Sequence, residues 1–138
     1  MKDFMYVTSE NLVYCTPDCT IPIIAKKLLE NWTDTVLIAD GKSKVLGIVT
    51  DGIIWNLISK RDPKIYDYKA KDIMDKNLKI IEVKKGFNFI DKMRNEIDKT
   101  PVKRLIVKKE GEIIGLIQKK IYEKIKRHAR TFNVEFKT

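Results

Sequence analysis

The chain has 138 residues, of which 43% are hydrophobic and 34% are charged, and its formal net charge is +9. This length suits one compact unit or two small repeats that share a core. No apolar stretch approaches the ~18 residues of a membrane span, and residues 1–4 do not begin a signal peptide, so we expect a cytoplasmic protein with no membrane partner. The content of Lys, Ile and Glu is similar to that of thermophilic proteins.

Residues 1–11 form a short lead-in to the first predicted elements. Residues 12–15 predict a strand that Pro17 ends, because the residue before a proline is held in an extended conformation. Residues 21–29 predict a helix that begins near Thr20, tolerates Pro22 in its first turn and ends near Trp32.

Residues 36–59 predict a β-hairpin followed by a helix. The apolar runs VLIA and VLGIV flank a polar turn at residues 40–44, as expected for a hairpin. Thr50 and Asp51 follow the second strand, and either can cap the next helix by accepting a backbone N–H. Such a helix end also attracts anions.

The second half of the chain predicts the same order of elements. Residues 60–71 lack apolar periodicity and contain Pro63, so we expect them to connect the two halves. Residues 78–83 predict a strand, residues 87–93 a helix, and residues 105–117 a second hairpin. A basic helix follows at residues 119–129, and the C-terminal tail is expected to fray.

The two halves are also similar in sequence. The second hairpin follows the first after 68 residues, so that LI at 37–38 aligns with LI at 105–106 and VLGIV at 45–49 with IIGLI at 113–117. A D-x-M sequence begins each copy, at residues 3–5 and 72–74. An internal repeat indicates two similar structural units. The predicted organisation is repeat 1 at 1–60, a connection at 61–71, repeat 2 at 72–130 and a tail at 131–138.

This organisation resembles a tandem pair of CBS domains, named after cystathionine β-synthase, which is also called a Bateman module. The resemblance rests on D-x-M at the start of each copy, Thr16-Pro17, LGIVTD at 46–51 and IGLI at 114–117. It covers essentially the whole chain. It implies an α/β (α+β) fold of two β-α-β-β-α repeats, packed as a pseudo-two-fold pair.

The resemblance also implies a ligand in the cleft between the repeats, commonly AMP, ATP or S-adenosylmethionine. In family members that bind adenosine phosphates, the pattern G-h-x-[ST]-x-x-D supplies a hydroxyl for the phosphate and an Asp for the ribose. Here Thr50 fills the hydroxyl position, but Ile53 occupies the Asp position. Asp51 either binds the ligand or caps the helix, and the second copy has Gln118 and Ile121 at these positions, so its site is degenerate or binds something else.

The expected ligand-binding residues fall in both copies. In the first copy they are Tyr14, Cys15, Thr16, Pro17, Val36, Thr50 and Asp51. In the second copy they are Ile81, Lys103, Arg104, Gln118 and Lys119.

Metal binding and catalysis have little support in the sequence. Cys15 and Cys19 are spaced C-x-x-x-C, and the single histidine, His128, is distant in sequence, whereas zinc needs four ligands. We expect two free, buried or half-buried thiols in a reducing cytosol. Because no nucleophile, histidine and acid form a recognisable set, we expect neither an enzyme nor a cofactor.

Helical spacing predicts which residues face the core. Ile53, Ile54, Leu57 and Ile58 form one stripe, and Ile121, Tyr122 and Ile125 form the corresponding stripe in the second copy. Trp55 lies off the first stripe, which predicts either a dimer interface or a partly buried core position. Because CBS pairs associate through such helices, the resemblance implies a homodimer.

Three functions remain open from the sequence. The first is a regulatory module that senses an adenosyl nucleotide and passes its occupancy, as a shape change, to an unidentified effector protein. The second is a nucleic-acid-associated protein, because the net charge of residues 1–69 is zero and the whole +9 belongs to residues 70–138. These lysines could instead form a solvated surface. The third is a structural dimerisation module whose ligand sites have degenerated.

Overall fold

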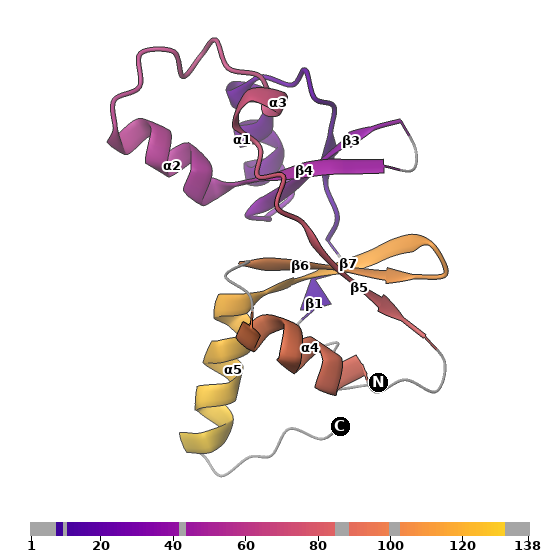
Figure 1. Ribbon diagram of the computed structural model, residues 1–138. Coiled ribbons are helices and arrows are strands. Elements are labelled where there is room, and N and C mark those ends of the chain that lie inside the picture. Colours follow the sequence, from indigo (N-terminus) through magenta and orange to yellow (C-terminus); the bar gives the residue numbers. More distant parts are fainter. Residues whose placement is uncertain (1–7, 10, 42–43, 85–88, 100–102, 132–138) are drawn as a thin grey trace. The chain divides into compact units, whose positions relative to one another are not determined.

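The computed structural model describes residues 8–9, 11–41, 44–84, 89–99 and 103–131. The chain divides into two compact units (Figure 1). We call residues 11–77 the first unit, and residues 78–138 with the N-terminal strand β1 the second unit. The elements of the first unit are β2 (Tyr14–Cys15), α1 (Ile21–Glu30), β3 (Thr35–Asp40), β4 (Lys44–Thr50), α2 (Asp51–Ser59) and α3 (Ala70–Ile73). Those of the second are β1 (Thr8–Ser9), β5 (Lys79–Val83), α4 (Phe89–Lys99), β6 (Arg104–Lys109), β7 (Glu112–Gln118) and α5 (Lys119–Thr131).

Both units have the predicted strand-helix-strand-strand-helix order. In the first unit, β2 pairs in parallel with β3, which pairs antiparallel with β4. In the second unit, β5 pairs in parallel with β6, which pairs antiparallel with β7. The mixed α/β fold of two repeats is therefore confirmed, while their packing about a pseudo-two-fold axis stays a prediction.

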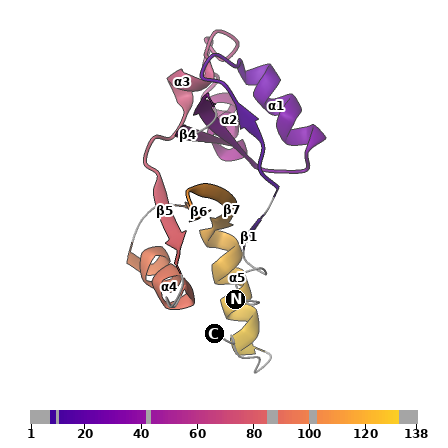
Figure 2. The same cartoon turned by 90° about the vertical axis from the view of Figure 1, so that its right-hand side faces the viewer.

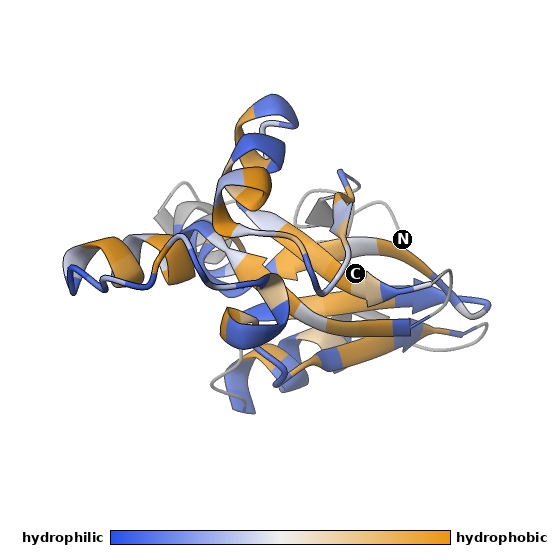
Figure 3. Ribbon diagram, turned by 90° about the horizontal axis from the view of Figure 1, so that it is seen from above, coloured by the Kyte–Doolittle hydropathy of each residue, from blue (hydrophilic) through white to orange (hydrophobic). Residues whose placement is uncertain are grey.

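Alternating side chains place the core of each unit between its sheet and its helices. In the first unit, Val36 and Val49 pair across β3 and β4 and belong to the same buried cluster as Ile24 and Leu28 of α1. In the second unit, one cluster unites seven buried residues: Ile81, Met93, Ile97, Leu105, Val107, Ile117 and Tyr122. The strands are largely apolar, whereas the helices carry both apolar and polar residues (Figure 3). Figure 2 shows α1 and α2 beside the strands of the first unit.

The predicted alignment of the two hairpins is wrong by one residue for their first strands. A register shift follows Ile38 in the first unit and Val107 in the second, which makes these two residues equivalent, 69 positions apart. The second strands keep the predicted spacing of 68, because Gly47 pairs with Ile38 and Gly115 with Val107. The second hairpin absorbs the difference with a shorter turn. Its two residues, Glu110 and Gly111, have φ of 53° and 81°, as a type I′ turn requires.

The segment before each repeat packs on the sheet of the other repeat. Strand β1 pairs with β7 in the second unit. In the first unit, Asp75 exchanges two backbone hydrogen bonds with Ile48, of 3.0 and 2.8 Å. A Cβ on Gly47 would lie 2.8 Å from Met74 Cγ and Sδ and 2.9 Å from the Asp75 carbonyl oxygen. Gly47 is thus required by the packing of the segment that crosses β4. The corresponding D-x-M at residues 3–5 lies outside the described residues.

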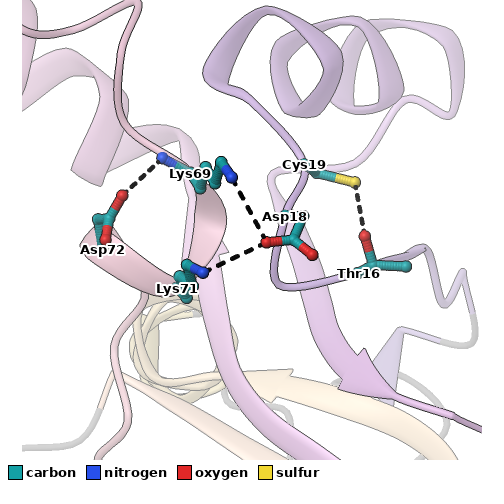
Figure 4. Close-up of polar contacts among 6 residues, drawn as sticks. All are labelled: Thr16, Asp18, Cys19, Lys69, Lys71 and Asp72. Carbon is teal, nitrogen blue, oxygen red and sulfur yellow. Dashed lines mark hydrogen bonds and ion pairs between the residues drawn. The ribbon is translucent and has the colours of Figure 1, made fainter.

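The packed units therefore differ in extent from the predicted sequence repeats. Residues 61–77 belong to the first unit, although a connection was predicted at 61–71. Within this segment, the short helix α3 was not predicted, and the Asp72 carboxylate accepts the Lys69 backbone N–H at its start, at 2.9 Å. Lys69 and Lys71 both form ion pairs with Asp18, at 3.8 and 3.4 Å (Figure 4). The predicted boundaries of the sequence repeats themselves stay a prediction.

Helices α1 and α2 both end at a left-handed residue that is not glycine. Trp32 has φ of 51° and Arg61 has φ of 52°. The Thr33 N–H donates to the Leu28 carbonyl at 3.2 Å, and the Asp62 N–H donates to the Leu57 carbonyl at 3.1 Å. These bonds are typical of Schellman caps, in which glycine is the usual left-handed residue.

The apolar stripes of α2 and α5 are only partly correct as predicted. In α2, Ile54 is buried, but Ile58 is 52% exposed because it lies in the last turn, and Trp55 is 62% exposed. In α5, Tyr122 is buried, whereas Ile121 is 37% exposed. The side chain of Ile125 lies outside the described residues.

Candidate functional site

Thr50 lies at the junction of β4 and α2, where the sequence predicts a ligand contact. Its backbone is extended, with φ of −106° and ψ of 161°, and its hydroxyl oxygen accepts the Ile53 backbone N–H at 3.3 Å. Thr50 is therefore the N-cap of α2. A hydroxyl that accepts one hydrogen bond still carries its own hydrogen. Thr50 can thus cap the helix and donate to a bound group at the same time.

Asp51, the other predicted cap, is the first residue of α2. One carboxylate oxygen accepts the Gly52 backbone N–H at 2.7 Å, which places a negative charge at the positive end of the helix. Its own N–H donates to the Asp34 carbonyl at 3.0 Å. This bond joins the start of α2 to the residue that precedes β3.

Asp34 and Thr35 complete this end of the hairpin, although neither was among the residues predicted for the site. Thr35 is directly opposite Thr50 in the register of β3 and β4. Its side chain is almost fully buried, at 1% exposed, and its hydroxyl donates to the Asp34 carboxylate at 2.8 Å. The available signal was the hairpin itself, since the first residue of one strand opposes the last residue of the other. Two hydroxyls and two carboxylates therefore gather at the open end of this hairpin.

The equivalent end of the second hairpin has the same backbone geometry and the opposite charge. Arg104 is opposite Gln118, and the Lys119 N–H donates to the Lys103 carbonyl at 2.9 Å, as Asp51 does to Asp34. Three cationic residues, Lys103, Arg104 and Lys119, thus stand where the first unit has Asp34, Thr35 and Asp51. The four residues predicted for the second copy at this junction do come together in one place.

Tyr14 lies on the same sheet face as Thr50. It is opposite Leu37, Leu37 is opposite Ile48, and Ile48 precedes Thr50 by two residues along β4. The Tyr14 side chain is 41% exposed, and partial burial raises the pKa of its phenol. Its carbonyl oxygen accepts a hydrogen bond from Lys27 Nζ at 2.7 Å.

The other predicted residues near β2 and in the cores lie elsewhere. Thr16 is exposed and Pro17 half-buried in the turn after β2. Cys15, Val36 and Ile81 are 5%, 0% and 0% exposed, and they belong to the cores beneath the helices. Because neighbouring strand residues alternate between faces, these three side chains lie on the face opposite Thr50 or Gln118. Their side chains therefore pack in the cores, and their assignment to a ligand site stays a prediction.

Some kinds of site are absent from the residues that the structure describes. No group of three or more His, Cys, Asp or Glu among them could hold a metal ion. No helix within those residues is long and apolar enough to cross a bilayer. The side chain of His128 lies outside them.

Comparisons with known proteins agree with the observed repeat. Residues 2–54 match the sequence model of the CBS domain. A search of curated proteins found no matching sequence.

Solved structures share the fold over most of the chain. An uncharacterized conserved protein from Pyrococcus horikoshii is 20% identical with a TM-score of 0.67, and the match covers 88% of this chain and 89% of that one. The CBS-domain containing protein ATU1752 from Agrobacterium tumefaciens is 18% identical with a TM-score of 0.66, covering 86% and 91%.

A third similar structure contains bound small molecules. The CBS domain pair of protein MJ0100, in complex with 5-methylthioadenosine and S-adenosyl-L-methionine, is 16% identical with a TM-score of 0.65, and the match covers 86% of this chain and 94% of that one. At these identities the likeness concerns the fold. Residues 2–54 thus match the CBS domain, and with the same topology in its second repeat the chain has the fold of a tandem CBS pair.

Proposed function

We propose that this protein is a regulatory module that binds an adenosyl nucleotide and passes its occupancy, as a change of shape, to an effector protein. The observation that carries the proposal is the polar group at the open end of the first hairpin, where Thr50 caps α2 beside Asp34 and Asp51. The complex of MJ0100 with 5-methylthioadenosine and S-adenosyl-L-methionine supports the choice of ligand class.

Each hairpin end favours a different kind of chemical group. The carboxylates of Asp34 and Asp51 can accept hydrogen bonds from the two hydroxyls of a ribose, and they favour a cationic group nearby. The Thr50 hydroxyl can donate to an oxygen of the same ligand. Lys103, Arg104 and Lys119, at the start of α5, favour an anionic group such as a phosphate.

This difference in charge predicts an order of preference among ligands. At the first hairpin end we propose a ligand with a ribose and little negative charge, such as S-adenosylmethionine or 5-methylthioadenosine. AMP and ATP suit the end in the second unit better, because the two carboxylates of the first would repel their phosphates. Thermal-shift measurements with all four compounds test this order, since a ligand that binds only the folded state raises the melting temperature.

A substitution can separate the two roles of Thr50. Valine would remove the helix cap together with the donor, at a cost of about 0.5–2 kcal/mol. Thr50→Asp keeps an oxygen that accepts the Ile53 N–H but has no hydrogen to donate. We expect it to keep the helix cap and to bind uncharged 5-methylthioadenosine, which the added carboxylate does not attract by charge, about 10-fold or more weakly by calorimetry.

Thr50→Ser is the matched control, because serine keeps both the cap and the donor. We expect its affinity to remain close to that of the wild type. Unchanged affinity in the Thr50→Asp protein would remove Thr50 from the site. If none of the four compounds raises the melting temperature of the wild type, a structural dimerisation module without a ligand becomes the better-supported function.

We also propose that two copies associate through helices α1 and α2. The described residues expose large apolar side chains at the ends and outer faces of these helices, which include Ile23, Leu29, Trp32, Trp55 and Ile58. Trp32 is 95% exposed although its left-handed backbone would be more stable with glycine. A large apolar residue in such a position contributes little to its own fold, which supports a role in contact with another molecule.

A further inference from the structure

The two cysteines of the first unit lie on either side of one tight turn. Cys15 ends β2 and is 5% exposed, whereas Cys19 is half-buried. The turn between them is closed by the Cys19 N–H, which donates to the Thr16 carbonyl at 3.2 Å. Both cysteines are free thiols.

The backbone on each side of the turn is fixed by hydrogen bonds. Cys15 pairs with Ile38 in the sheet. The Cys19 carbonyl accepts the Ala70 N–H at 2.7 Å, and the Lys71 N–H donates to the Pro17 carbonyl at 3.0 Å. Cys15 belongs to the buried cluster of the first unit and Cys19 packs against that cluster, so the fold holds both side chains in one region. Folding has therefore already met much of the entropic cost of bringing them together.

The surroundings of Cys19 favour its thiolate. Burial opposes ionisation, but hydrogen bonds from the Cys15 thiol and from Thr16, together with the charge of Lys27, outweigh it and lower the pKa of Cys19. Thr16 Oγ1 lies 3.6 Å from Cys19 Sγ (Figure 4). The neighbouring Asp18 is ion-paired with Lys69 and Lys71, so its negative charge is offset.

Cys15 has the opposite character. Burial, a hydrogen bond with Cys19 and the charge of Cys19 raise the pKa of Cys15 to about 12. Its thiolate is therefore much scarcer than that of Cys19, so it reacts more slowly with an external oxidant. Once the sulfur of Cys19 is no longer a thiolate, the negative charge that opposes ionisation of Cys15 is lost.

We propose that Cys15 and Cys19 form a reversible redox site, in which Cys19 attacks a low-molecular-weight disulfide such as glutathione disulfide and Cys15 resolves the product. The Cys19 thiolate attacks one sulfur of the disulfide, whose S–S bond breaks, and one thiolate leaves. Cys15 then loses its proton and attacks the Cys19 sulfur. The mixed disulfide breaks, the second small thiol leaves with a proton, and the Cys15–Cys19 disulfide remains. Two protein thiols are oxidised and one small disulfide is reduced to two thiols.

Mass spectrometry of the folded protein, incubated with glutathione disulfide, tests each step. We expect the wild type to lose two hydrogens, and dithiothreitol to restore the original mass. Cys15→Ala should accumulate one glutathione on Cys19, because the resolving thiol is absent. Cys19→Ser should remain unmodified on the same timescale. Circular dichroism confirms that each variant is folded before it is treated.

The same chain unfolded in urea provides the reference for the geometry. Oxidation of the unfolded chain but not of the folded protein would overturn the proposal, because the fold would then keep the two sulfurs apart. A stable glutathione adduct on the wild type would exclude Cys15 as the resolving thiol. Modification of Cys15 in Cys19→Ser at the rate seen for Cys19 in Cys15→Ala would refute the assigned roles.

Discussion

Replacing Gly47 by alanine tests whether the close packing of Met74 and Asp75 against β4 requires a glycine at this position. Gly47 belongs to the LGIVTD sequence that suggested a ligand site, but its environment is occupied by the segment that crosses β4. An added Cβ would lie 2.8 Å from Met74 Cγ and Sδ and 2.9 Å from the Asp75 carbonyl oxygen. Carbon atoms do not approach other heavy atoms this closely, so the neighbours must move. The Met74 side chain can rotate, whereas the Asp75 carbonyl is held by the Ile48 N–H at 3.0 Å.

The cost follows from these two contacts. Overpacking of a filled site costs about 1–3 kcal/mol. Displacing the Asp75 carbonyl weakens a backbone hydrogen bond, which adds about 0.5–1.5 kcal/mol. We therefore expect Gly47→Ala to lower the free energy of unfolding by roughly 2–4 kcal/mol. This is a large part of the ~5–15 kcal/mol that stabilises a typical protein.

Urea denaturation followed by circular dichroism and tryptophan fluorescence measures this loss. Gly52→Ala is the control, because the nearest atom to its added Cβ is Thr50 Oγ1, at an ordinary 3.7 Å. In the first turn of α2 this alanine should cost nothing or stabilise by up to about 1 kcal/mol.

A double-mutant cycle with Met74→Ala identifies the contact. It removes Cγ and Sδ but leaves the Asp75 carbonyl, so it should recover part of the stability lost in Gly47→Ala. We expect a coupling of about 1 kcal/mol or more between positions 47 and 74. A Gly47→Ala protein within about 0.5 kcal/mol of the wild type would show that the crossing segment does not pack on β4 as described.

Further predictions concern assembly, charge and the thiols. The chain should be a dimer by light scattering at tens of micromolar, and a monomeric wild type would contradict this. Trp32→Gly should weaken the dimer. The same change should stabilise the monomer by up to about 1 kcal/mol, because glycine accepts the left-handed backbone. We expect little nucleic-acid binding by anisotropy at ~0.15 M salt, because the basic row of α5 lacks interleaved aromatic residues for stacking and Tyr122 of this helix is buried in the core. Micromolar binding that Lys120→Glu and Lys124→Glu abolish would put the nucleic-acid function first. Alkylation of Cys19 by iodoacetamide should reach half its maximal rate at a lower pH in the folded protein than in the urea-unfolded chain, since the rate follows the thiolate and the fold lowers the pKa of Cys19. An equal or higher midpoint in the folded protein would contradict this prediction.

The sequence by itself determined the strands and helices of the two repeats and their order, but not the short elements β1 and α3. Apolar runs and a polar turn define the first hairpin, and a hydroxyl before an apolar-rich segment defines the start of α2 at Thr50. These signals depend on neighbours within a few residues, and so they are visible without the fold. The repeated pattern then indicated two units and the family.

Only the tertiary structure decided which parts of the chain lie together. The short strand β1 gains its hydrogen bonds from β7, far away in sequence, so neither its pattern nor its length predicts it. In sequence Gly47 belongs to a ligand motif, whereas in the fold Met74 and Asp75 pack closely against it. The pairing of β3 with β4 brings Asp34 beside Asp51 and Thr50, and the corresponding pairing of β6 with β7 brings Lys103 and Arg104 beside Lys119. Each of these features depends on contacts between residues that are distant in sequence. A shift of one residue in the strand register would change all of these contacts.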